Sequence, residues 1–133
     1  MTPDEIETLP LSDMQARLPK LQFYMVFMRP VDPSADPRPM LAQHGRPHLL
    51  FLHDLERRGI LLASGPQRAE EGHWDGTGVA VLRADSLAAA RAIAEQEPLH
   101  VAGLRRNEVL GWQISEASFT FTLRLLDGTF DMR

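Results

Sequence analysis

The sequence predicts an α+β domain of the ferredoxin-like type, in which a β-α-β-β-α-β order of elements forms an antiparallel sheet with two helices on one face. Apolar runs of strand length alternate in that order with segments of helical periodicity between residues 21 and 114. A chain of 133 residues also suits one domain with a core of its own. Residues 1–20 are expected to be an N-terminal extension, and residues 115–133 an extension that adds a C-terminal strand.

The first half of the domain is predicted to contain a strand, a loop and a helix. Leu21–Met28 is a compact run of aromatic and apolar residues, which is typical of a strand. Residues 30–39 hold four prolines and are expected to be a stiff loop, and residues 40–44 a preliminary turn. Pro47 suits the first turn of a helix and Gly59 suits its end, so the helix is expected between them.

The second half is predicted to supply the other helix and the remaining strands. Asp85 and Ser86 offer an N-cap for an alanine-rich helix, which Pro98 is expected to stop. In the tail, Phe and Leu alternate with Thr and Arg over residues 119–125, and this period of two predicts a strand. The other strands are expected at Ile60–Ala63, at Val79–Arg83 and within Arg105–Ile114.

The second face of the predicted sheet also needs a cover, because a sheet buries apolar surface against a second layer. A chain of this length leaves only the N-terminal extension and the tail strand for that purpose. A homodimer formed sheet to sheet is therefore the simplest arrangement.

The composition excludes several classes of function. A net charge of −4 and the absence of a basic run give no reason to expect a nucleic-acid partner. The sequence contains no cysteine, which excludes disulfides, thiolate metal sites and cysteine nucleophiles. No apolar run approaches the ~20 residues that span a membrane, and the acidic N-terminus does not resemble a signal peptide. A cytoplasmic protein with no membrane partner is expected.

One histidine lies on the apolar face of the first predicted helix. On a wheel of 3.6 residues per turn, His48 shares a face with Phe51, Leu52 and Leu55, so its ring is expected to point into the protein. An unperturbed imidazole titrates close to neutral pH and is a natural proton shuttle. A core histidine that is hydrogen-bonded to the backbone is the simpler alternative.

Two segments of the sequence carry a family resemblance. They are H-L-L-F-L-H-D-L-E-R-R-G-I-L-L-A-S-G-P, which begins at His48, and E-P-L-H-V-A-G at residues 97–103. Through them the chain from about Phe23 to Trp112 resembles the YciI-like (YCII-related) domain family. The resemblance implies a dimeric α+β barrel with an active centre made of a histidine, matched by His48, and an aspartate. The family's usual Asp-Pro pair stands here as Glu97-Pro98, with a side chain longer by one methylene.

The carboxylate partner of His48 stays open between two residues. The motif match favours Glu97, although a solvated carboxylate at a helix end is the simpler interpretation of that residue. The topology, as judged from the sequence, favours Asp32, because the end of the first strand lies beside the start of the first helix and Glu97 is expected toward the other end of the sheet. A turn-forming Asp before Pro33 is the simpler interpretation of Asp32.

Four further residues are candidates for substrate binding. Arg29 is suited to hold a substrate carboxylate with two parallel hydrogen bonds, and a surface arginine at a strand end is the simpler alternative. Backbone N–H groups of the turn formed by Ser64, Gly65 and Pro66 are candidates to face a ligand, although an ordinary strand-end turn explains the same residues.

These candidates predict a proton-transfer enzyme of the lyase or isomerase type that acts on a small organic acid or ring metabolite. His48 is the expected general acid or base, with Asp32 or Glu97 as its partner. A non-catalytic ligand-binding or accessory module with the same dimeric fold is the alternative. We expect no cofactor, and the glycines at 72, 76 and 78 do not form a phosphate-binding loop because no helix follows them directly. We expect no metal, because Pro47 interrupts the helical spacing of His44 and His48.

Overall fold

The computed structural model describes residues 1–69, 71–126 and 128–132, and the chain divides into two compact units. Gln22–Trp112 forms the larger unit, and both ends of the chain belong to the other. Within the described residues, no helix has both the length and the apolar character needed to cross a membrane.

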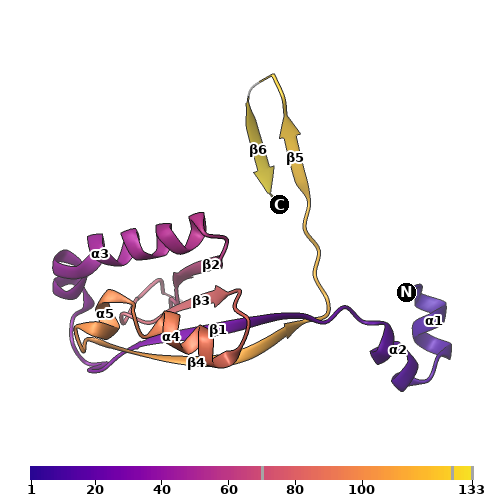
Figure 1. Ribbon diagram of the computed structural model, residues 1–133, viewed down its shortest axis with the longest axis horizontal. Coiled ribbons are helices and arrows are strands. Elements are labelled where there is room, and N and C mark those ends of the chain that lie inside the picture. Colours follow the sequence, from indigo (N-terminus) through magenta and orange to yellow (C-terminus); the bar gives the residue numbers. More distant parts are fainter. Residues whose placement is uncertain (70, 127, 133) are drawn as a thin grey trace. The chain divides into compact units, whose positions relative to one another are not determined.

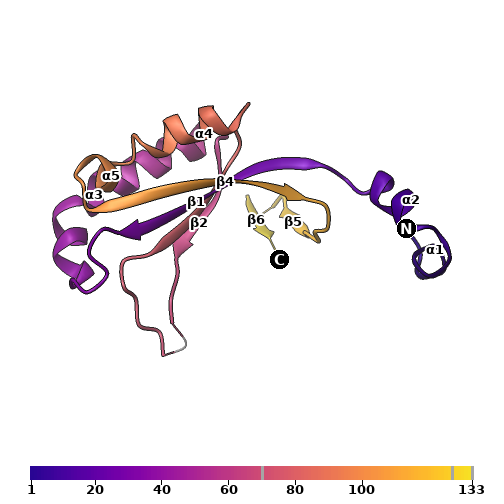
Figure 2. The same ribbon diagram turned by 90° about the horizontal axis from the view of Figure 1, so that it is seen from below.

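The larger unit contains a four-stranded antiparallel sheet with the strand order β2-β3-β1-β4. The helices α3, α4 and α5 all lie on one face of it, as Figures 1 and 2 show. The predicted α+β fold of the ferredoxin-like type is thereby confirmed. The strands are β1 (Leu21–Pro30), β2 (Leu61–Pro66), β3 (Gly78–Leu82) and β4 (Arg105–Ile114), and the helices are α3 (Pro37–Arg57), α4 (Leu87–Ala94) and α5 (Pro98–Val101).

The core lies between the sheet and the helices because alternate strand residues point toward the helices. Tyr24, Val26 and Met28 of β1 are buried, and Tyr24 and Val26 pair across the sheet with Leu82 and Ala80. The helices bury Leu55 of α3 together with Ala90 and Ala94 of α4 against these strands.

The first helix of this unit differs from the sequence prediction. It begins at Pro37, where the Asp36 carboxylate accepts a hydrogen bond from the N–H of Arg38, and it continues through Pro47. Two features favour a helix start here, an Asp at the N-cap and a proline at the first helical position. Their stabilisation outweighs the free-energy cost of Pro47 inside the helix. The first turns bend away from the axis of the rest in Figures 1 and 2, as expected for a helix with an internal proline. His48 therefore lies in the middle of α3.

The second helix is shorter than predicted. Ser86 caps α4 as expected, but α4 ends at Ala94, and Pro98 begins the separate helix α5. A proline stabilises a first helical turn as readily as it stops a preceding helix, so the sequence supports both outcomes. This break places Glu97 between the two helices as the N-cap of α5.

The two ends of the chain also contain regular structure. The N-terminal extension forms α1 (Pro3–Thr8), with a capping box between Thr2 and Glu5, and α2 (Leu11–Arg17). The tail was predicted as one strand but forms a hairpin of β5 (Phe121–Arg124) and β6 (Thr129–Met132). Gly128 between them has a φ of 61°, a conformation that glycine adopts without steric cost.

Candidate active site

The Glu97 carboxylate is buried and fixed by the start of α5. Its Oε1 accepts a hydrogen bond from the N–H of Leu99 at 3.1 Å, and its Oε2 accepts one from the N–H of His100 at 3.0 Å. Only 3% of the side chain is exposed. The N–H groups of a first helical turn lack partners within the helix, so a carboxylate at the N-cap satisfies them and is held by them.

His48 and Glu97 form a hydrogen-bonded pair. The Nδ1 atom of His48 lies 2.7 Å from Oε1 of Glu97, and 12% of the His48 side chain is exposed. Because an ionised carboxylate only accepts hydrogen bonds, the imidazole carries its proton on Nδ1. The Nε2 atom is then unprotonated in the neutral ring and available as a base.

Of the two carboxylates considered from the sequence, the structure brings Glu97 to His48. The strand β3 is antiparallel to β1, so α4 leads back along the sheet and its end lies beside α3, where α5 packs (Figure 1). The expectation that Glu97 lies toward the other end of the sheet is wrong, because it overlooked this reversal.

Asp32 lies elsewhere in the structure. Its exposed carboxylate accepts hydrogen bonds from the hydroxyl and the N–H of Ser34, at 2.6 and 3.0 Å, which lower the pKa of this carboxyl. His48 lies eleven positions after Pro37, which places it about 16 Å further along the helix axis. The expected proximity of Asp32 to His48 depended on a helix that starts at Pro47, and it is wrong because α3 starts ten residues earlier, at Pro37.

His48 lines a cavity of about 470 Å³ between α3, β2 and the loop that precedes β3. Ser64, Gly65 and Pro66, the predicted binding turn, belong to β2 and form one wall of this cavity. Leu41, Leu49 and Leu52 of α3, together with Trp74, give it a largely apolar lining. The volume and the lining are those of a site for a small organic molecule.

A buried arginine that the sequence interpretation missed also lines this cavity. Arg105 is only 4% exposed, and its Nη2 donates a hydrogen bond of 2.8 Å to the carbonyl of Gly76. Burial lowers the pKa of the Arg105 guanidinium, and the charge of Glu97 opposes that shift. The sequence did contain a signal for the burial of Arg105. Arg105 alternates along its strand with Asn107 and Val109, and this alternation places all three on the face that points toward the helices.

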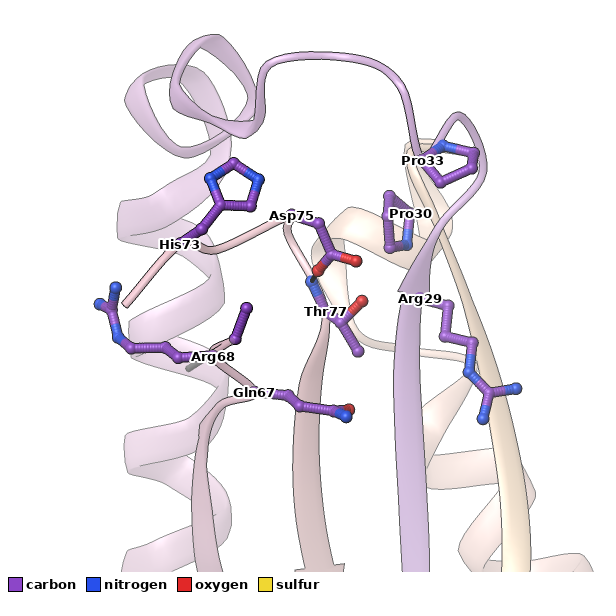
Figure 3. A pocket seen from close by; sticks show the side chains of 9 residues that line it. Arg29, Pro30, Pro33, Gln67, Arg68, His73, Asp75 and Thr77 are labelled. Atoms are coloured by element: carbon purple, nitrogen blue, oxygen red, sulfur yellow. Dashed lines mark hydrogen bonds between the residues drawn. The ribbon is translucent and has the colours of Figure 1, made fainter. Parts of the chain in front are cut away.

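Arg29, the predicted anion clamp, does not line the cavity of His48. It borders a separate pocket of about 530 Å³, where Figure 3 shows its guanidinium directed away from Arg68 and His73. Its Nη1 lies 2.9 Å from Oε2 of Glu108, and both side chains are more than half exposed. The structure therefore supports the simpler interpretation of Arg29 as a surface residue.

No group of three or more histidine and acidic side chains is arranged to hold a metal ion in the part of the chain that the structure describes. His44 and His48 lie four residues apart in a continuous α3, contrary to the interruption expected at Pro47.

The Glu97 pair makes stability depend on pH. Burial alone would raise the pKa of the Glu97 carboxyl, but the hydrogen bonds from His48, Leu99 and His100 outweigh it, and the net pKa is lowered. A carboxyl whose pKa is lower in the folded state contributes stability above its ordinary pKa and loses that contribution as the pH falls through the folded value.

We therefore expect the stability advantage of the wild type over Glu97→Gln to be full at about pH 7 and to shrink on acidification below about pH 4.5. Urea unfolding of both proteins across this range measures the difference. Glutamine has nearly the same shape and does not titrate, so an advantage that stays constant with pH would contradict the assignment to this carboxylate.

Comparisons with known proteins agree with the fold. The chain is similar to a solved structure of 5-chloro-2-hydroxyhydroquinone dehydrochlorinase from Burkholderia phenoliruptrix in complex with 2,5-dihydroxybenzoquinone. The two share 21% identity with a TM-score of 0.53 over 67% of this chain and 92% of the other. No curated protein matches the sequence. The family model of the YCII-related domain matches residues 22–113, which contain α3, α4 and α5 and all of the sheet except its end residues Leu21 and Ile114, and the chain accordingly belongs to the YCII-related domain family.

Proposed function

We propose that this protein is an enzyme that moves a proton on a small carboxylated or cyclic metabolite, in a reaction of the lyase or isomerase type. The observation that carries the proposal is the 2.7 Å contact between Nδ1 of His48 and Oε1 of Glu97 on the wall of an apolar cavity. A histidine with one nitrogen held by a buried carboxylate and the other free is arranged for general acid–base catalysis.

In the proposed reaction, Nε2 of His48 takes a proton from a carbon atom of the substrate. Glu97 keeps the ring in the tautomer with the proton on Nδ1 and stabilises the imidazolium that forms. The proton then returns to another carbon atom in an isomerase, or a leaving group departs in a lyase. The similar dehydrochlorinase is named for an elimination, which is a reaction of the lyase type, and this supports the choice of reaction class.

This function is tested by measuring two reactions, proton exchange and elimination, with a set of candidate substrates. The purified protein is incubated in D₂O with small keto acids, cyclic ketones and 5-chloro-2-hydroxyhydroquinone, and deuterium uptake is followed by NMR and chloride release by titration. We expect at least one compound to react faster than with heat-unfolded protein. If none reacts although the cavity binds small molecules, the chain is the non-catalytic binding module that is the alternative function.

We also propose that the protein is a homodimer joined through the face of the sheet opposite to α3, α4 and α5. The side chains that alternate with the core residues form a partly exposed apolar surface on that face, and it includes Phe23, Phe27, Val79, Leu110 and Trp112. A second copy of the chain is the partner that this surface fits, because a two-fold arrangement pairs the same apolar patch with itself.

Replacing Leu110 by aspartate is expected to weaken the dimer at least about tenfold, because it buries a charge in an apolar interface. Sedimentation equilibrium measures the dissociation constant. Leu50→Asp is the matched control, since Leu50 is exposed on α3 and shares no face with the sheet. A monomeric wild type, or a Leu110→Asp protein with the wild-type dissociation constant, would refute the proposed interface.

A further inference from the structure

Arg105 carries more hydrogen-bonding capacity than its surroundings use. Its Nη2 bonds to the Gly76 carbonyl, its Nη1 lies 4.0 Å from the sulfur of Met28, and its buried Nε has no hydrogen-bond partner. It forms no ion pair with any of the residues that the structure describes. A guanidinium presents five N–H donors in a planar fork, so most of this fork is unused.

Such an arrangement of a buried guanidinium is energetically unfavourable. A buried charge without an opposite charge in contact loses its hydration and gains little in return. The Glu97 carboxylate acts on Arg105 only through its field, because its oxygens are already bonded to His48, Leu99 and His100. An anionic group that enters the cavity would supply the missing acceptor.

We propose that Arg105 binds an anionic oxygen group of the ligand, a carboxylate or an ionised ring hydroxyl, inside the cavity that His48 lines. This inference rests on the proposed function and narrows its substrate class to small anions. A guanidinium binds a carboxylate through two parallel charge-assisted hydrogen bonds, which fix its orientation as well as its position. Anchoring one end of a small ligand in this way presents its remaining atoms to the wall that holds His48.

The alternation of β4 supplies a control for this role. Arg106 is the next residue along the strand and is exposed on the opposite face of the sheet. Arg105→Met and Arg106→Met thus remove the same charge from adjacent positions, but only the first removes it from the cavity. Arg105→Lys keeps the charge and removes the planar fork.

Benzoate and benzamide are suitable probes because they have nearly the same shape and differ by one charge. Titrations followed by ¹H–¹⁵N NMR measure the affinity of each probe for the wild type and the three variants. We expect the wild type and Arg106→Met to bind benzoate at least about tenfold more tightly than benzamide. The Arg105 Nε–H signal, which Arg105→Met removes, should shift on addition of benzoate. Arg105→Met should bind the two probes alike, and Arg105→Lys should fall between.

The proposal is overturned if the wild type binds neither probe or binds both alike, or if Arg105→Met keeps the benzoate preference. Should Arg105→Met give the NMR spectrum of an unfolded chain, Arg105→Lys decides, since a full wild-type preference in that variant would exclude a role for the fork. Binding of these probes requires no turnover. Loss of the benzoate preference in Arg105→Met therefore supports the anion site even if no proton transfer is found, and proton transfer with a neutral substrate refutes the anion site alone.

Discussion

Replacing Glu97 by alanine is expected to lower the free energy of unfolding by about 3–5 kcal/mol, as for removal of one member of a buried charged network. The substitution leaves the N–H groups of Leu99 and His100 without an acceptor and removes the partner of the His48 Nδ1 atom. It also removes a negative charge that acts on the buried Arg105. These losses fall at the junction of α3, α4 and α5, so we expect α5 to lose its order first.

Urea unfolding followed by circular dichroism measures this change, and Glu95→Ala is the matched control. Glu95 is an exposed carboxylate two residues earlier, and its removal is expected to change the free energy of unfolding by no more than about 0.5 kcal/mol. Glu97→Asp keeps an N-cap side chain and should lose less than Glu97→Ala. Equal losses for Glu97→Ala and Glu95→Ala would mean that the buried network contributes little to stability.

The sequence predicted the fold because its periodicities are local and strong. The compact apolar run of Leu21–Met28 and the apolar face shared by His48, Phe51, Leu52 and Leu55 are properties of neighbouring residues, and the structure forms a strand from the first and turns the second toward the core. The start of α3 was less predictable. Two prolines in the chain, Pro37 and Pro47, are each compatible with a first helical turn, and only packing decides between a second start and a bend.

The candidate site was only partly predictable because its members meet through tertiary structure. His48 was found from the face it shares with apolar residues, but its partner required the correct direction of the second helix over the sheet. Arg105 was overlooked in favour of Arg29, although the alternation of β4 placed it on the covered face. A charged residue at a position predicted to be buried is thus a more informative signal for a binding site than a charged residue at a strand end.

Replacing His48 by glutamine is expected to lower the rate of the proton-transfer reaction by about 10²–10⁴-fold, the usual contribution of a positioned general acid or base. Glutamine retains a polar group near Glu97 but cannot take up a proton near neutral pH. We expect the affinity for benzoate to change by less than about threefold, since the proposed anion contact belongs to Arg105. The same deuterium and chloride assays, under saturating substrate, measure the rate.

The control for this variant is His53→Gln, on the same helix but at an exposed position outside the cavity. It should keep the wild-type rate, which separates the role of His48 from general effects of removing a histidine from α3. A His48→Gln protein that is folded and binds benzoate but reacts at the wild-type rate would exclude His48 as the base. Because the two measurements depend on different residues of one cavity, a loss of rate without a loss of binding is the result that assigns proton transfer to His48 and recognition to Arg105.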